Sequence, residues 1–218
     1  MCGRCINMIA NLWHSPEKSE WKTGAPGIGS SEACMLGGVA AWLRWRARRK
    51  AEGKPYDKPN LVMSTAYQVV WEKFCQLWQI EMRTVPLSRD NITLDAKQAI
   101  AMCDENTICI VPIAGVTWTG MNDDVEALDK ALDAYNSKTG YDIPIHVDAA
   151  SGGFILPFLN PDKKWDFRLK WVRSISTSGH KYGLVYPGLG WVIWRDKTFL
   201  PEEMSFSVNY LGANITQV

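Results

Sequence analysis

Short apolar runs alternate with longer stretches of helical spacing through most of the chain. The runs have the length and composition of buried strands, and they occupy residues 60–64, 81–86, 108–112, 143–147, 172–178 and 188–194. Helical intervals separate the apolar side chains of residues 67–78, 95–106 and 123–139, and Gly140 stands where the last of these helices should stop. This alternation predicts an α/β fold, a mostly parallel sheet sandwiched by helices.

The first fifty residues predict two further helices. Residues 1–13 carry an apolar helical face, and the charged, turn-rich stretch 14–24 is expected to be a loop. The sequence Gly-Ile-Gly-Ser-Ser-Glu at 27–32 then opens a long helical pattern. Basic residues crowd the end of this helix, which its dipole makes favourable for cations, and we interpret them as a solvated helix end: Arg44, Arg46, Arg48, Arg49 and Lys50.

Composition is that of an ordinary globular protein. The chain has 218 residues, enough for one large domain or a domain and a half, with 46% hydrophobic and 22% charged residues. A formal net charge of +1 gives no electrostatic reason to expect nucleic acid or an anionic membrane as a partner. No signal peptide or membrane-spanning run is recognisable, so a cytoplasmic protein is expected. The 11 tryptophans fall mostly in apolar patterns and are interpreted as packing residues.

Cysteine spacing predicts no metal site. Cys2 and Cys5 form a Cys-x-x-Cys pair, but no second pair with zinc-ligand spacing follows. The other four lie in apolar patterns and are predicted to be small core residues: Cys34, Cys75, Cys103 and Cys109.

Two predicted strands place reactive side chains at their carboxyl ends. Asp148 follows the run 143–147, and Gly179-His180-Lys181 follows the run 172–178. Open α/β sheets carry their chemistry outside the carboxyl ends of the strands. A carboxylate and an amine brought together there suit pyridoxal phosphate, which uses a lysine Schiff base and an acidic partner at its ring nitrogen. Each residue alone has an ordinary alternative, a solvated lysine or an aspartate helix cap.

The start of the long helix is a candidate anion site. Glycines, the hydroxyls of Ser30 and Ser31, and free backbone N–H groups together suit a phosphate. A plain serine N-cap has the same spacing and stays open as the alternative.

Two segments resemble a known family. His146-Val147-Asp148-Ala149-Ala150 and Ser178-Gly179-His180-Lys181 are similar to the pyridoxal-phosphate-dependent group II decarboxylases, most closely the glutamate decarboxylases of bacteria, fungi and plants. The resemblance implies the large domain of the fold-type I (aspartate aminotransferase-like) pyridoxal-phosphate enzymes. Residues 1–218 would form the central part of that domain, without the family's N-terminal arm and C-terminal small domain.

The resemblance also assigns roles at the reacting part of the cofactor. Lys181 would carry the cofactor as an imine, Asp148 would keep its ring nitrogen protonated, and His180 would contact the phosphate or bridge toward the substrate carboxylate. These three are the predicted catalytic residues. Ala150 would let the ring lie flat, although ordinary packing explains it almost as well. His146 is expected to be a buried, hydrogen-bonded histidine.

Further positions are assigned to cofactor binding. Ser30 and Ser31 would bind the phosphate, and Ser178 belongs to the same predicted site. Gln68 matches the position that stacks over the ring, where many group II decarboxylases carry His and the bacterial glutamate enzymes carry Gln. Thr117 would contact the cofactor near its ring hydroxyl and the substrate carboxylate. A Gln near a helix start and a Thr in a Gly-flanked turn are also commonplace without any such role.

The activity implied by the resemblance is conversion of L-glutamate to 4-aminobutanoate and carbon dioxide. The reaction consumes a proton, and the family commonly serves acid resistance. A homodimer or higher homo-oligomer is expected, with no nucleic-acid or membrane partner. Two alternatives stay open: a decarboxylase of an aromatic amino acid or aspartate, and a catalytically silent truncated module. In the family, the groups that bind the distal carboxylate of glutamate lie upstream of the position of residue 1.

Overall fold

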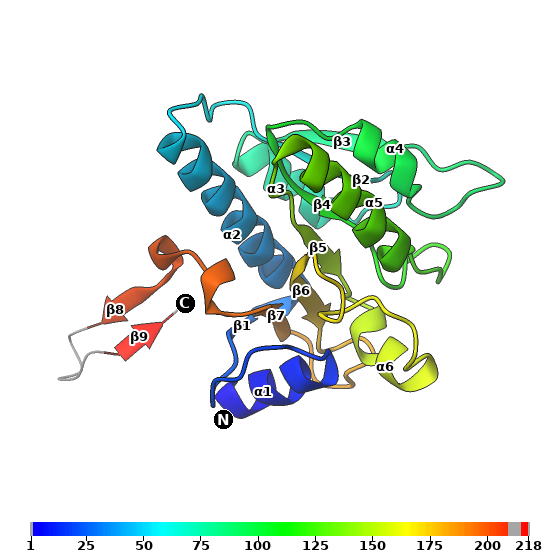
Figure 1. Cartoon of the computed structure of the whole chain (residues 1–218). Helices are drawn as coiled ribbons and strands as arrows, with labels where there is room; N and C mark the ends of the chain where they lie inside the picture. Colours follow the sequence, from blue (N-terminus) through cyan, green and yellow to red (C-terminus); the bar gives the residue numbers. More distant parts are fainter. Residues whose placement is uncertain (1, 209–214, 218) are drawn as a thin grey trace.

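A seven-stranded sheet runs through the middle of the molecule (Figure 1), in the order β1-β7-β6-β5-β4-β2-β3. The computed structural model describes residues 2–208 and 215–217. Within the sheet β7 runs antiparallel to β6 and β1, whereas neighbours from β6 to β3 are parallel, so the predicted mostly parallel sheet is confirmed. The strands are β1 (Gly24–Gly27), β2 (Asn60–Ser64), β3 (Glu81–Val85), β4 (Thr107–Val111), β5 (Ile145–Asp148), β6 (Val172–Ser178) and β7 (Gly190–Trp194), with β8 (Phe206–Val208) and β9 (Ile215–Gln217) forming a separate pair.

Helices cover both faces of the sheet (Figure 1). Successive strand residues point to opposite faces, so Leu61 of β2 belongs to the core cluster that includes residues of α2 and α3, while Val62 belongs to the cluster that includes residues of α4 and α5. A helix with the length and apolarity to cross a bilayer is not found among the described residues. The helices are α1 (Cys2–Leu12), α2 (Gly29–Ala51), α3 (Val69–Leu77), α4 (Ala96–Ala101), α5 (Val125–Thr139) and α6 (Leu156–Leu159), with short 3-10 turns η1 (Gly152–Phe154), η2 (Lys197–Phe199) and η3 (Glu202–Met204).

Some elements differ from the sequence prediction. Helix α4 is shorter than residues 95–106, because the Asp104 carboxylate accepts a hydrogen bond from the backbone N–H of Asn106 at 2.8 Å and turns the chain into β4. Strand β1 is not predicted, since Gly24–Gly27 shows no apolar alternation and pairs with β7 through its backbone. Its edge position tolerates Pro26. The predicted helix stop at Gly140 is confirmed, with a left-handed φ of 74°.

Many of the tryptophans pack in the core, but two of them are exposed. Trp13, Trp165 and Trp194 are fully buried. Trp21 and Trp118 are 57% and 77% exposed, so the packing interpretation is wrong for these two.

Candidate functional site

Asp148 ends β5 and lies buried at the carboxyl edge of the sheet. Its Oδ2 accepts a hydrogen bond from Nε1 of Trp71 at 2.8 Å, and its Oδ1 accepts one from the backbone N–H of Ala150 at 3.1 Å. The turn η1 begins later, with Ser151 at its cap position, so the helix-cap alternative for Asp148 is wrong. Two donors therefore fix the orientation of a buried carboxylate.

Polar side chains on β5 and β6 lie on the same face of the sheet as this carboxylate. Nδ1 of His146 lies 2.7 Å from Oγ of Ser174, and its Nε2 lies 3.1 Å from Oγ of Ser176. The Ser176 hydroxyl is also 3.2 Å from Sγ of Cys34 on α2. Burial lowers the pKa of His146 to about 3, so the imidazole is neutral. The expected buried, hydrogen-bonded histidine is confirmed.

Lys181 is half-buried in the turn that follows β6. Its Nζ donates to Oγ of Ser151 at 3.4 Å. The neighbouring His180 is exposed. The loop is tied at its base, because the backbone N–H of Gly179 donates to the carbonyl of Leu189 at 2.9 Å. Lys181 therefore lies close to a fixed backbone position.

The Ser178 side chain lies at the end of β6. Its Oγ is buried and makes no hydrogen bond within the described part of the chain. Ser178 pairs with Gly190 of β7, where an added Cβ would lie 2.5 Å from the carbonyl of Gly29 and 2.8 Å from the backbone nitrogen of Ser30. Only glycine permits this approach, which places the first turn of α2 beside the end of β6.

The start of α2 is not capped by a serine. Its N-cap is Ile28, which makes no side-chain cap bond, and Glu32 accepts from the Ile28 backbone N–H instead. The serine N-cap alternative is therefore wrong, because Ser30 and Ser31 lie inside the first turn. Ser30 is half-buried and Ser31 is exposed.

Gln68 and Thr117 meet although they come from separate loops. Nε2 of Gln68 donates to Oγ1 of Thr117 at 2.7 Å. Gln68 is the N-cap residue of α3, and Trp71 lies in the first turn of the same helix. The Thr117 loop is held at Asp148, whose backbone carbonyl accepts from the N–H of Ala114 at 2.9 Å. One end of α3 thus contacts both the buried carboxylate and the loop beyond it.

The pKa of Cys34 reports on the charges around it. Burial raises the pKa of this thiol well above its usual range, the charge of Asp148 raises it further, and the charge of Lys181 lowers it. Both charges therefore act on the same point, one helical turn after Ser30. Asp148 pairs with Ser176 of β6, and Ser151 accepts from Nζ of Lys181. Gly190, the partner of Ser178 in β7, approaches the start of α2, so the predicted carboxylate, amine and helix start lie at one edge of the sheet.

Sequence reasoning does not find several residues of this site. Trp71 is interpreted as packing, although its spacing of three residues from Gln68 places both on one side of α3. Ser151, Ser176 and Cys34 carry no signal in the sequence, because their contacts join distant segments.

The remaining candidates for chemistry are metal-binding side chains and the cysteines. Among residues 2–208 and 215–217, no group of three or more His, Cys, Asp or Glu side chains could hold a metal ion. Core burial is confirmed for Cys34, Cys75 and Cys109, whereas Cys103 is half-buried. The thiols of Cys2 and Cys5 are free.

The fold is that of the large domain of fold-type I pyridoxal-phosphate enzymes, with its polar groups gathered at the carboxyl edge of a mostly parallel sheet. A lysine and a buried carboxylate stand at that edge, and pyridoxal-phosphate enzymes use groups of these two kinds.

Comparison with known proteins identifies the family. The pyridoxal-dependent decarboxylase conserved domain matches residues 1–218, and the chain belongs to this family. The expected pyridoxal cofactor is thus confirmed as that of the family.

Individual relatives are similar over nearly the whole chain. A glutamate decarboxylase beta of Listeria innocua is 56% identical over 214 residues, which are 97% of this chain and 46% of that protein. Glutamate decarboxylase 5 of Arabidopsis thaliana is 55% identical over 97% of this chain and 43% of its own length. The solved glutamate decarboxylase of Lactobacillus brevis has a TM-score of 0.94 at 52% identity, covering 99% of this chain and 49% of that one. The chain spans about half the length of these relatives.

Proposed function

We propose that the chain binds pyridoxal phosphate and provides the cofactor site of a glutamate decarboxylase, which converts L-glutamate to 4-aminobutanoate and carbon dioxide. The observation that carries this proposal is the pairing of β5 with β6, which places Asp148 beside the end of the strand that leads through Ser178 to Lys181. Identities of 56% and 52% to glutamate decarboxylases support glutamate as the substrate.

The groups near the start of α2 fit a phosphate. The buried Ser178 hydroxyl has no hydrogen-bond partner among residues 2–208 and 215–217, and leaving such a group unpaired costs roughly 1–3 kcal/mol. Backbone N–H groups of the first turn, including that of Ser30, receive no side-chain cap. These donors and the helix dipole would hold the phosphate, with Ser30 and Ser31 contributing their hydroxyls.

The groups around Asp148 fit the ring. Trp71 and the Ala150 backbone hold the carboxylate in one orientation, from which it would accept the ring N–H and stabilise its positive charge. Gln68, fixed by Thr117, would lie against the ring face. Ala150 would leave room on the other face.

The chemistry follows from these placements. When bound, pyridoxal phosphate supplies the electron sink for the pair left behind as carbon dioxide departs. Lys181 would attach the cofactor through Nζ and give way to the amino group of the substrate, with the Ser151 hydroxyl steadying the amine. His180, adjacent and exposed, would contact the phosphate or the substrate carboxylate.

The test is to find which lysine carries the cofactor. The purified chain is incubated with pyridoxal phosphate, reduced with borohydride, digested and examined by mass spectrometry. We expect one labelled peptide, bearing Lys181, and no label there in Lys181→Ala. A label on another lysine contradicts the assignment. Lys197, exposed in η2 beyond β7, offers a matched control as Lys197→Ala.

Substrate choice is tested separately. A protein of the relatives' length that includes this chain is offered glutamate, aspartate and aromatic amino acids, and the amine products are measured. Release of 4-aminobutanoate supports the proposal. Release of an aromatic amine or an aspartate product favours the related decarboxylase, and cofactor binding without any product favours the silent module.

Domain, assembly and compartment are proposed with the function. The chain corresponds to the central part of the cofactor-binding large domain, which its coverage of 46% of a relative supports. A homo-oligomer is proposed because exposed apolar side chains, among them Leu184 and Tyr186, stand in the loop that carries Lys181. A cytoplasmic location is supported by six free thiols in the described part of the chain.

A further inference from the structure

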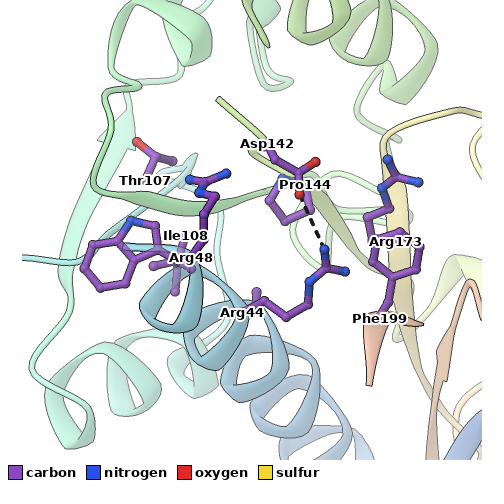
Figure 2. A pocket seen from close by; sticks show the side chains of 10 residues that line it. Arg44, Arg48, Thr107, Ile108, Asp142, Pro144, Arg173 and Phe199 are labelled. Atoms are coloured by element: carbon purple, nitrogen blue, oxygen red, sulfur yellow. Dashed lines mark hydrogen bonds and ion pairs between the residues drawn. The ribbon is translucent and has the colours of Figure 1, made fainter. Parts of the chain in front are cut away.

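A recess lies at the opposite edge of the sheet from Asp148 and Lys181. It is lined where β4, β5 and β6 begin, by the second half of α2 and by Phe199 (Figure 2). Because these strands are parallel, their starts lie away from the edge that carries the cofactor groups. The recess measures about 70 Å³, which suits a small ion.

The charge of this recess is unbalanced. Three guanidinium groups, those of Arg44, Arg48 and Arg173, line it with one carboxylate, that of Asp142. Arg44 pairs with Asp142 at 3.4 Å, and among the described residues no carboxylate lies within ion-pair distance of Arg48 or Arg173. Nε of Arg173 is buried and has no hydrogen-bond partner there. A buried N–H without an acceptor in the protein leaves Arg173 a donor for a bound anion or water.

Surrounding charges leave this imbalance in place. Burial lowers the pKa of Arg173, an effect that Asp142 and Asp196 oppose and that Arg195 and Arg44 reinforce. Oδ1 of Asp196 accepts from the backbone N–H and the hydroxyl of Thr198, which holds this carboxylate at the start of the η2 turn. An anion held between the guanidinium groups would offset the cost of burying them.

Apolar packing fixes the arginines before any ligand arrives. The guanidinium carbons of Arg44 and Arg173 lie 4.2 and 4.4 Å from the ring centre of Phe199. Arg173 also lies 5.2 Å from the ring centre of Trp171. Stacked, planar donors in fixed positions suit a multidentate anion.

The basic residues in the second half of α2 therefore have different surroundings, and not all of them are solvated. Arg49 is buried and donates Nε to the carbonyl of Pro55 at 2.8 Å, so the solvated helix end is wrong for this residue. Arg46 stacks 4.5 Å from the ring centre of Trp42. Only Arg44 and Arg48 of these basic residues line the recess. Helix α2 ends one turn beyond Arg48, where its dipole disfavours anions, so the guanidinium charges must carry the binding.

We propose that this recess binds one small tetrahedral oxyanion, such as inorganic phosphate, between Arg44, Arg48 and Arg173. The bound anion joins α2, the start of β6 and the turn that holds Phe199. It is separate from the phosphate site at the other end of α2, and it stabilises the folded chain by mass action.

The test measures the thermal unfolding midpoint of the 218-residue chain against phosphate concentration at constant ionic strength. Ser30→Ala and Ser31→Ala are included throughout, which removes the hydroxyls of the proposed cofactor-phosphate site. We expect a saturable rise in the midpoint. Arg173→Gln should weaken the apparent affinity at least about ten-fold, because a charged hydrogen bond is lost. Arg46→Gln makes the same charge change on α2 outside the recess, and it should leave the affinity unchanged.

Several results overturn the proposal. A midpoint that does not respond to phosphate, or equal losses in Arg173→Gln and Arg46→Gln, would exclude a specific site. If Arg173→Gln does not fold, Arg48→Gln is compared with Arg46→Gln in the same way. Acetate is titrated as a separate arm, and stabilisation by acetate equal to that by phosphate would contradict a tetrahedral oxyanion. Selenate soaked into crystals should give an anomalous peak within the recess, and a peak only elsewhere contradicts the assignment.

Discussion

Trp71→Phe tests the hydrogen bond that orients the buried carboxylate. The change keeps an aromatic ring in the core and removes the indole N–H that lies 2.8 Å from Oδ2 of Asp148. Both residues are buried, so water cannot readily replace the lost donor. Hydrogen bonds to charged groups contribute roughly 1.5–3 kcal/mol, and this is the expected loss in the free energy of unfolding.

Trp13→Phe is the matched control for this variant. Trp13 is equally buried and donates Nε1 at the same 2.8 Å, but its acceptor is the neutral carbonyl of Gly153. A neutral hydrogen bond contributes about 0.5–1.5 kcal/mol, so the loss should be about half as large. Both variants are unfolded in urea, with and without pyridoxal phosphate.

Cofactor affinity separates a positioning role from a structural one. Trp71→Phe should weaken pyridoxal phosphate binding, measured from the visible absorbance of the bound cofactor, because the Asp148 carboxylate is no longer fixed. Trp13→Phe should bind the cofactor as the unchanged chain does. Equal destabilisation by the two variants, together with unchanged cofactor affinity in Trp71→Phe, would refute the reasoning.

Four further changes have defined outcomes. In a protein of the relatives' length, Asp148→Asn should lower turnover far more than cofactor affinity, because Asn supplies no negative charge; near-normal turnover would remove Asp148 from the ring-nitrogen role. Ser30→Ala with Ser31→Ala should weaken cofactor affinity about ten- to thousand-fold, measured by absorbance titration, and unaltered affinity would exclude phosphate contacts. The pKa of His146 is about 3 in the folded chain against an ordinary 6.5, so the unfolded chain binds a proton at higher pH than the folded one. The free energy of unfolding should therefore fall from pH 6.5 toward pH 3 by up to ~1.4 kcal/mol per pH unit. Urea unfolding should depend less on pH in His146→Gln, and an unchanged pH dependence would contradict this. The 218-residue chain alone should release no measurable 4-aminobutanoate, since relatives are about twice its length, and robust turnover would refute this expectation.

The sequence predicts the sheet and its reactive edge because those signals are local. Strands β5 and β6 fall within or beside the predicted runs 143–147 and 172–178, so the positions of Asp148 and Lys181 at their carboxyl ends follow directly. Gln68 and Thr117 are each predicted singly, and their 2.7 Å contact depends on how two loops meet.

Other features depend on contacts that no local pattern records. Strand β1 exists because β7 offers it a backbone partner, and its own composition favours a turn. The sequence predicts only a packing role for Trp71, because its hydrogen bond to the Asp148 carboxylate joins segments far apart in the chain. The guanidinium carbon of Arg173 lies 4.4 Å from the ring centre of Phe199, a contact between separate segments that no local pattern predicts.

The tie between Gly179 and Leu189 gives the loop after β6 two mechanically different parts. Lys181 lies near the clamped base, whereas Leu184 and Tyr186 stand exposed toward the tip. Residues added between Tyr186 and Gly188 would lengthen the free part and leave the clamp, and hence the lysine, where they are. A peptide tag inserted there is expected to leave Lys181 in place while it obstructs any contact of Leu184 and Tyr186 with a second copy of the chain.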